Sequence, residues 1–169
     1  VTAIKIPAER SYMHIDTVFT HIKRGLWVMF SPFSKDFGKP ATGEIDVAAA
    51  VKRETANKKS DVEITQFIRN DNADGHSIET KQYDYLDDLL KAISREEFGV
   101  KNPEIVLSAG GEYPYAQREQ WTDACNFLTI KEGVIIGYDR NVRTAKEFKE
   151  KHNFKTVSYT HLTLPTTYG

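Results

Sequence analysis

The chain has 169 residues, 40% of them hydrophobic and 28% charged, which is the composition of one globular domain or part of one. A formal net charge of −1 argues against general attraction to nucleic acid or to an anionic membrane, and no apolar run approaches the ~20 residues of a membrane helix. Cys125 is the single cysteine and cannot form an internal disulfide, which favours a reducing cytoplasm.

The first half of the chain predicts mainly strands. A short strand over residues 2–6 ends at Pro7, and residues 12–22 predict a second strand because they are rich in β-branched and aromatic side chains. The unbroken apolar run 26–30 predicts a strand that is buried on both faces. The pattern then predicts a loop over residues 31–43 and a helix over 46–59. A strand with alternating polar and apolar residues over 62–68 and a turn over 70–75 follow.

The second half begins with the clearest helix, over residues 85–98, whose apolar side chains form one stripe at helical spacing. Gly99 is a plausible cap at its C-terminal end. The remaining pattern predicts a strand over residues 104–108 and a two-stranded hairpin over 127–138. A second helix over 144–152 and the start of another strand over 154–157 follow. Strand, strand, helix and strand thus recur loosely, and the fold class is mixed α/β.

The end of the chain differs from the rest. Residues 157–167, VSYTHLTLPTT, resemble one translated frame of a sequencing-library adapter. We therefore expect residues 157–169 to be a non-native tail, and residues 1–156 to be the natural part of the chain. The adapter also implies that the natural reading frame continues beyond this point.

His14 and Asp16 are the first candidate site residues. On the strand predicted over 12–22, side chains two apart point to the same face, with α-carbons ~6–7 Å apart. A histidine beside a carboxylate can transfer protons next to a site that holds a cation. Taken alone, the pattern is more often that of a structural polar pair. Five scattered histidines and one cysteine show no zinc-type spacing, so we expect neither a metal nor a cofactor.

Three sequence blocks give these residues more weight. They are MHIDTVF at 13–19, REQWTDACN at 118–126 and GYDRN at 137–141, with the pair Gly110 and Gly111 before the second block. In order and spacing they resemble the blocks of arginine deiminases, and the resemblance runs from about Ile4 to Thr156. Cys125 departs from it, because the family usually has a small residue there.

The resemblance implies a fold and an activity. The fold would be the pentein type, a five-bladed α/β propeller, of which this chain would supply about two strand-strand-helix-strand blades. The activity would be hydrolysis of L-arginine to L-citrulline and ammonia through a cysteine thiolate. His14 would be the general acid and base, and Asp16 would hold the substrate guanidinium. The nucleophile and the other site residues would lie outside this chain, which would therefore be inactive. Homo-oligomerisation of the complete protein stays open.

Alternatives remain at this stage. Another guanidine-modifying enzyme on the same fold, an amidinotransferase or a methylarginine hydrolase, would share the histidine and cysteine chemistry. A catalytically dead binding protein could also keep the scaffold. We expect Cys125 to be a packed residue rather than a nucleophile. Residues 118–120 are expected to form a structural hydrogen-bond network, and Asp139 with Arg140 a structural ion pair or cap.

Overall fold

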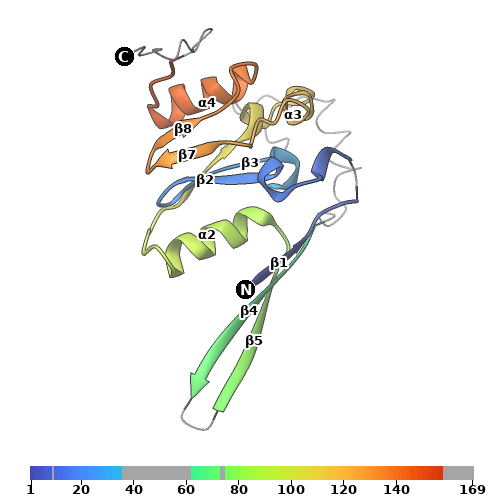
Figure 1. Ribbon diagram of the computed structural model, residues 1–169, viewed down its shortest axis with the longest axis vertical. Helices are drawn as coiled ribbons and strands as arrows, with labels where there is room; N and C mark the ends of the chain where they lie inside the picture. Colours follow the sequence, from blue (N-terminus) through green and yellow to red (C-terminus); the bar gives the residue numbers. More distant parts are fainter. Residues whose placement is uncertain (9, 36–61, 73–74, 158–169) are drawn as a thin grey trace, which may run out of the picture.

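The computed structural model describes residues 1–8, 10–35, 62–72 and 75–157 (Figure 1). The helix expected over 46–59 lies outside these residues, as does the expected tail after Val157. The strands are β1 (Thr2–Lys5), β2 (Phe19–Lys23), β3 (Leu26–Met29), β4 (Glu63–Asn72), β5 (Gly75–Tyr83), β6 (Glu104–Leu107), β7 (Leu128–Lys131) and β8 (Val134–Ile136). The helices are α2 (Leu86–Glu96), α3 (Tyr115–Gln120) and α4 (Val142–His152).

A three-stranded sheet of order β2-β3-β6 lies at the centre of the molecule. β2 and β3 are antiparallel neighbours, whereas β6 runs parallel to β3, with Leu26 opposite Glu104 and Met29 opposite Leu107. A parallel pair needs a long crossover, and here α2 lies within it. Every residue of β3 is buried, which confirms the doubly buried strand that the apolar run predicted.

Helix α2 confirms the helix predicted over 85–98. Leu86, Leu89 and Leu90 are buried in the main hydrophobic cluster, and the Trp27 indole Nε1 of β3 donates a hydrogen bond to Ser94 Oγ at 2.8 Å. Gly99 follows the helix with φ +65°, in the left-handed region that glycine adopts without strain. That turn lets the Val100 N–H donate to the Ser94 carbonyl at 3.0 Å.

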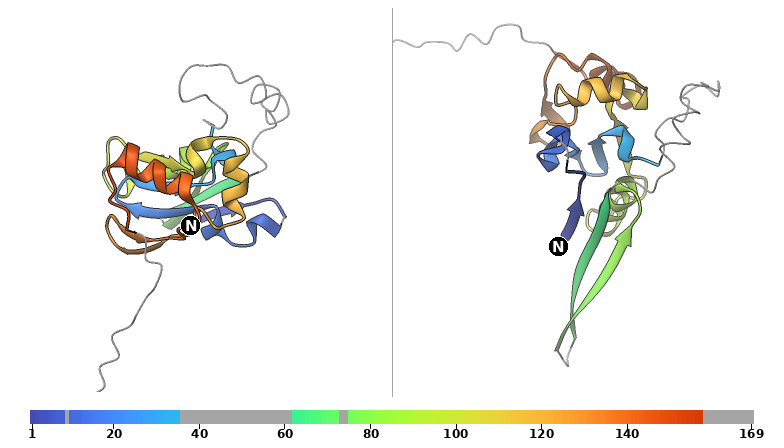
Figure 2. Two further views of the ribbon diagram at one scale, coloured as in Figure 1. Left: turned by 90° about the horizontal axis from the view of Figure 1, so that it is seen from above. Right: turned by 90° about the vertical axis from the view of Figure 1, so that its right-hand side faces the viewer.

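Two further sheets flank the centre. The predicted hairpin is confirmed as β7–β8, and it lies against β2 because Gly133 N donates to the Ile22 carbonyl at 3.1 Å. Helix α4 follows this hairpin, again as predicted. The other sheet has the order β1-β4-β5 and is antiparallel throughout. Its long β4–β5 hairpin extends well away from the rest of the molecule, as the right-hand view in Figure 2 shows.

Some predicted elements are wrong. The strand predicted over residues 12–22 begins only at Phe19, and short 3-10 turns occupy Arg10–Tyr12 and Ile15–Thr17. Residues 154–157, where the start of another strand was predicted, form no strand. β5 was not predicted because almost all of its residues are exposed, so no alternation of apolar and polar residues marks it. No helix in the described ranges is long and apolar enough to cross a membrane.

The turn between β2 and β3 offers a test of this packing. Gly25 has φ +71°, and a Cβ added there would meet Val100 Cγ1 at 2.5 Å. We expect Gly25→Ala to lower the free energy of unfolding by about 2 kcal/mol or more, from the left-handed backbone and the clash together. Urea unfolding of Gly99→Ala is the matched control, because Gly99 has φ +65° but open space around it. Equal losses in the two variants would contradict the close contact with Val100.

Candidate functional site

His14 and Asp16 lie on the loop that leads into β2. His14 has extended backbone angles, φ −134° and ψ 147°, and immediately precedes the 3-10 turn Ile15–Thr17, which contains Asp16. Both side chains are exposed. The expected pleat, which would have put the two side chains on one face, is therefore wrong, because the backbone is not extended from one residue to the other.

The turn is stabilised by its own threonine. Thr17 donates to the His14 carbonyl twice, from its backbone N–H at 3.2 Å and from its hydroxyl Oγ1 at 2.7 Å. Such side-chain to backbone bonds compete with strand formation. The β-branched residue that favoured a strand prediction is thus the one that closes the turn.

Both sides of the exposed loop are anchored to the core. On the N-terminal side the Tyr12 ring packs against Phe30 and Phe33, with centroids 5.8 and 5.2 Å away. On the C-terminal side Val18 is fully buried, and its carbonyl accepts a hydrogen bond from the Phe30 N–H at 2.7 Å. The short segment that carries His14 and Asp16 is therefore exposed between two fixed points.

Gln120 of the second block supports the same loop. Its amide Nε2 donates to the Thr17 carbonyl at 2.9 Å, across 103 residues of sequence. Gln120 lies at the end of helix α3, a six-residue element that was not predicted. The REQW block therefore contacts the loop of the first block directly.

Glu119 joins the second block to helix α4. Its carboxylate is 6% exposed and accepts three hydrogen bonds, from Arg143 N at 2.9 Å, Thr144 N at 3.0 Å and Thr144 Oγ1 at 2.6 Å. These amides belong to the first turn of α4, whose N–H groups have no partners within the helix. The carboxylate also lies at the end of the helix that favours negative charge. Glu119 is thus an N-terminal cap supplied from a distant segment.

The third block completes this network. Asn141 Nδ2 donates to the Thr122 carbonyl at 2.8 Å, and Thr122 Oγ1 donates to Asn141 Oδ1 at 2.5 Å. Arg140 forms an ion pair with Asp123 at 3.5 Å rather than with the neighbouring Asp139. The structural network expected over 118–120 is confirmed for Glu119 and Gln120, while the ion pair expected between Asp139 and Arg140 has a different acidic partner.

Cys125 is fully buried beneath this network. Burial and the nearby Glu119 carboxylate raise the pKa of its thiol, so the thiol stays protonated at neutral pH. Because the thiolate is the nucleophilic form, Cys125 is chemically inert here. This agrees with the expectation that it is a packed residue.

Other titratable groups lie apart from the loop. The His21 ring is tilted against Trp27, with centroids 4.3 Å apart, and stacks on Phe98 at 5.2 Å. Burial lowers the pKa of His21, so it is neutral and packed. Two cavities, of about 410 and 460 Å³, are lined by residues other than His14 and Asp16. The part of the chain that the structure describes holds no cluster of three or more His, Cys, Asp or Glu suited to a metal ion.

Comparison with known proteins identifies the family. The sequence profile of the family described as arginine deiminase matches residues 1–164. Arginine deiminases of Staphylococcus aureus strains JH9, Newman and COL are each 30% identical over 141 residues, which cover 83% of this chain. The chain spans 28% of the length of these relatives. It belongs to the arginine deiminase family.

Proposed function

We propose that the complete protein is a cytoplasmic enzyme that hydrolyses L-arginine to L-citrulline and ammonia, with His14 and Asp16 in its active site. Family membership over nearly the whole chain carries this proposal. The local structure supports it: both side chains are exposed on a short loop that Gln120 of the second family block contacts through a hydrogen bond. Active-site residues are commonly found on loops positioned by a rigid scaffold.

The proposed scaffold is a five-bladed pentein propeller, of which residues 1–156 supply about two blades. With the β4–β5 hairpin as an insertion between β3 and α2, the elements β2, β3, α2 and β6 follow the strand-strand-helix-strand order of one blade. The order β7, β8 and α4 repeats the first three elements of that unit. The repeat is the observation that favours a propeller over an unrelated mixed α/β fold.

The proposed chemistry assigns each residue a separate task. A thiolate attacks the guanidinium carbon, and the C–N bond to the leaving nitrogen then breaks as His14 gives that nitrogen a proton. Water, deprotonated by His14, adds to the covalent intermediate and releases the thiolate with citrulline. Asp16 accepts N–H donors of the guanidinium, which offers only donors. The thiolate must come from a cysteine other than the buried Cys125.

Product analysis of the complete protein tests the proposed function. Incubation with L-arginine should yield citrulline and ammonia in equal amounts. Transfer of an amidino group to an added amine, or hydrolysis of methylated arginine alone, would overturn the proposed substrate and reaction in favour of a related guanidine-modifying enzyme. Absence of any product from a folded, complete protein would indicate a non-catalytic member.

The 169-residue chain itself should be inactive. Loss of the nucleophile from a covalent mechanism commonly lowers the rate by several orders of magnitude, so we expect citrulline no higher than a buffer blank. A colorimetric citrulline assay on the purified chain, with the complete protein as positive control, measures this. Citrulline production by the chain alone would show that an internal group, and not an absent cysteine, starts the reaction.

A further inference from the structure

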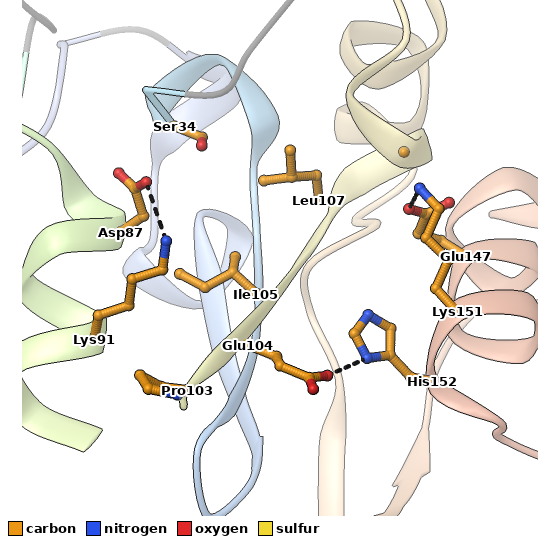
Figure 3. Close-up of a pocket in the computed structure, with 11 residues that line it drawn as sticks. Ser34, Asp87, Lys91, Pro103, Glu104, Ile105, Leu107, Glu147, Lys151 and His152 are labelled. Carbon is orange, nitrogen blue, oxygen red and sulfur yellow. Dashed lines mark hydrogen bonds and ion pairs between the residues drawn. The ribbon is translucent and has the colours of Figure 1, made fainter. Parts of the chain in front are cut away.

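A cavity of about 410 Å³ lies between α2, β6 and α4, and neither His14 nor Asp16 lines it (Figure 3). This volume is within the range of small-molecule sites. Ile105 and Leu107 of β6 form its apolar floor, between the two helices. The charged side chains of the walls are Asp87 and Lys91 on α2, Glu104 at the start of β6, and Glu147, Lys151 and His152 on α4.

The charges in the cavity alternate in sign. Asp87 Oδ2 and Lys91 Nζ are 3.9 Å apart on the α2 wall. On the other side, His152 Nδ1 lies 2.8 Å from Glu104 Oε2, and Lys151 pairs with Glu147. A site that presents acids and bases side by side over an apolar floor suits a ligand with both charges and a hydrocarbon part.

Among the charged side chains of the cavity walls, Asp87 gives the strongest indication of a bound ligand. Its side chain is 1% exposed and lies near the Lys35 backbone and the Lys91 ammonium, but in the described part of the chain no donor reaches either carboxylate oxygen with the geometry of a full hydrogen bond. Burial raises the pKa of this carboxyl, and the Lys91 ammonium and the Lys35 backbone lower it by less. A buried carboxylate whose nearest donors are this poorly placed costs free energy, so an N–H-rich ligand group would be favoured there.

We propose that this cavity binds a small α-amino acid with an aliphatic side chain. The α-ammonium group donates hydrogen bonds to Asp87, and the adjacent α-carboxylate accepts from Lys91. The two protein charges are close enough together to serve the two neighbouring charges of one amino acid. The aliphatic side chain lies over Ile105 and Leu107. This site is independent of the proposed hydrolysis at His14.

Calorimetric titration of the full chain with L-norleucine tests the site. We expect saturable binding, and at least tenfold weaker binding of n-pentylamine and of hexanoate, each of which lacks one of the two charges. Chemical-shift changes at the Ile105 and Leu107 amides should accompany binding. No saturable binding of norleucine, or equal binding of all three compounds, would overturn the proposal.

Substitutions in the α2 wall of the cavity test whether norleucine binds there. Asp87→Asn keeps the side-chain shape and should weaken norleucine binding at least tenfold. The matched control is Glu150→Gln, an exposed position on α4 whose carboxylate pairs with Lys146 at 3.9 Å, which should bind as the wild type does. Lys91→Met, at a partly exposed position, provides a second variant if Asp87→Asn does not fold. Unchanged affinity in a folded Asp87→Asn or Lys91→Met variant would refute the assignment.

Discussion

Replacement of His14 by alanine should abolish citrulline production by the complete protein and leave its fold intact. The imidazole is proposed to move protons in both halves of the reaction, and loss of a general acid or base commonly lowers rates ~10²–10⁴-fold. Alanine keeps the His14 carbonyl, which is the group that Thr17 uses to close the turn. The initial rate with saturating L-arginine, together with the circular dichroism spectrum, measures both expectations.

Two further variants test whether the loss of activity is specific to the His14 side chain. His76→Ala is the matched control, because His76 is an exposed histidine on the β4–β5 hairpin that pairs with Asp71, and its activity should equal the wild type. Asp16→Ala should raise KM for arginine and lower kcat together, since the carboxylate is proposed to hold the substrate throughout. Near-normal turnover by His14→Ala would show that another residue transfers the protons.

Glu119→Ala should be the most destabilising single substitution among the residues of the three blocks. It removes the acceptor of three hydrogen bonds and leaves two amides and one hydroxyl at the start of α4 without their partner. Hydrogen bonds to a charged group are each worth ~1.5–3 kcal/mol, and an N-cap is worth ~1 kcal/mol. We expect a loss of about 3 kcal/mol in the free energy of unfolding.

Urea unfolding of matched variants distinguishes capping from a general loss of charge. Glu150→Ala removes an exposed carboxylate from α4 itself and should change stability by no more than about 0.5 kcal/mol. Glu119→Gln keeps an acceptor oxygen and should fall between wild type and Glu119→Ala. If Glu119→Ala and Glu150→Ala unfold at the same urea concentration, the cap contributes nothing measurable.

The elements predicted well are those whose burial follows a simple period. Helix α2 presents Leu86, Leu89 and Leu90 to the core at helical spacing, and β3 is buried at every residue. In both elements the local sequence pattern matches the tertiary packing, so the pattern alone was sufficient to predict the secondary structure. β5 packs little against the core, and most of its residues are exposed, so its sequence has no comparable period.

The candidate site shows why residue identity was easier to predict than geometry. The family blocks point to His14 and Asp16, but their strand assignment failed because a hydroxyl of Thr17 closes a local turn. Strand propensity counts Thr17 as a strand former and does not include that bond. The partners of Glu119 and Gln120 were also beyond prediction, because they lie 24 and 103 residues away in sequence.

The length of the projecting β4–β5 hairpin can change without disturbing the core of the protein. β1 pairs with β4 only from Glu63 to Gln66, and beyond Phe67 the strands pair only with each other in the described part of the chain. That outer ribbon adds no burial to the core. Adding or removing one residue on each strand would therefore preserve the pairing and leave the β2-β3-β6 sheet untouched. Its length is free to drift in evolution, while the loop of His14 and the network behind it are constrained together.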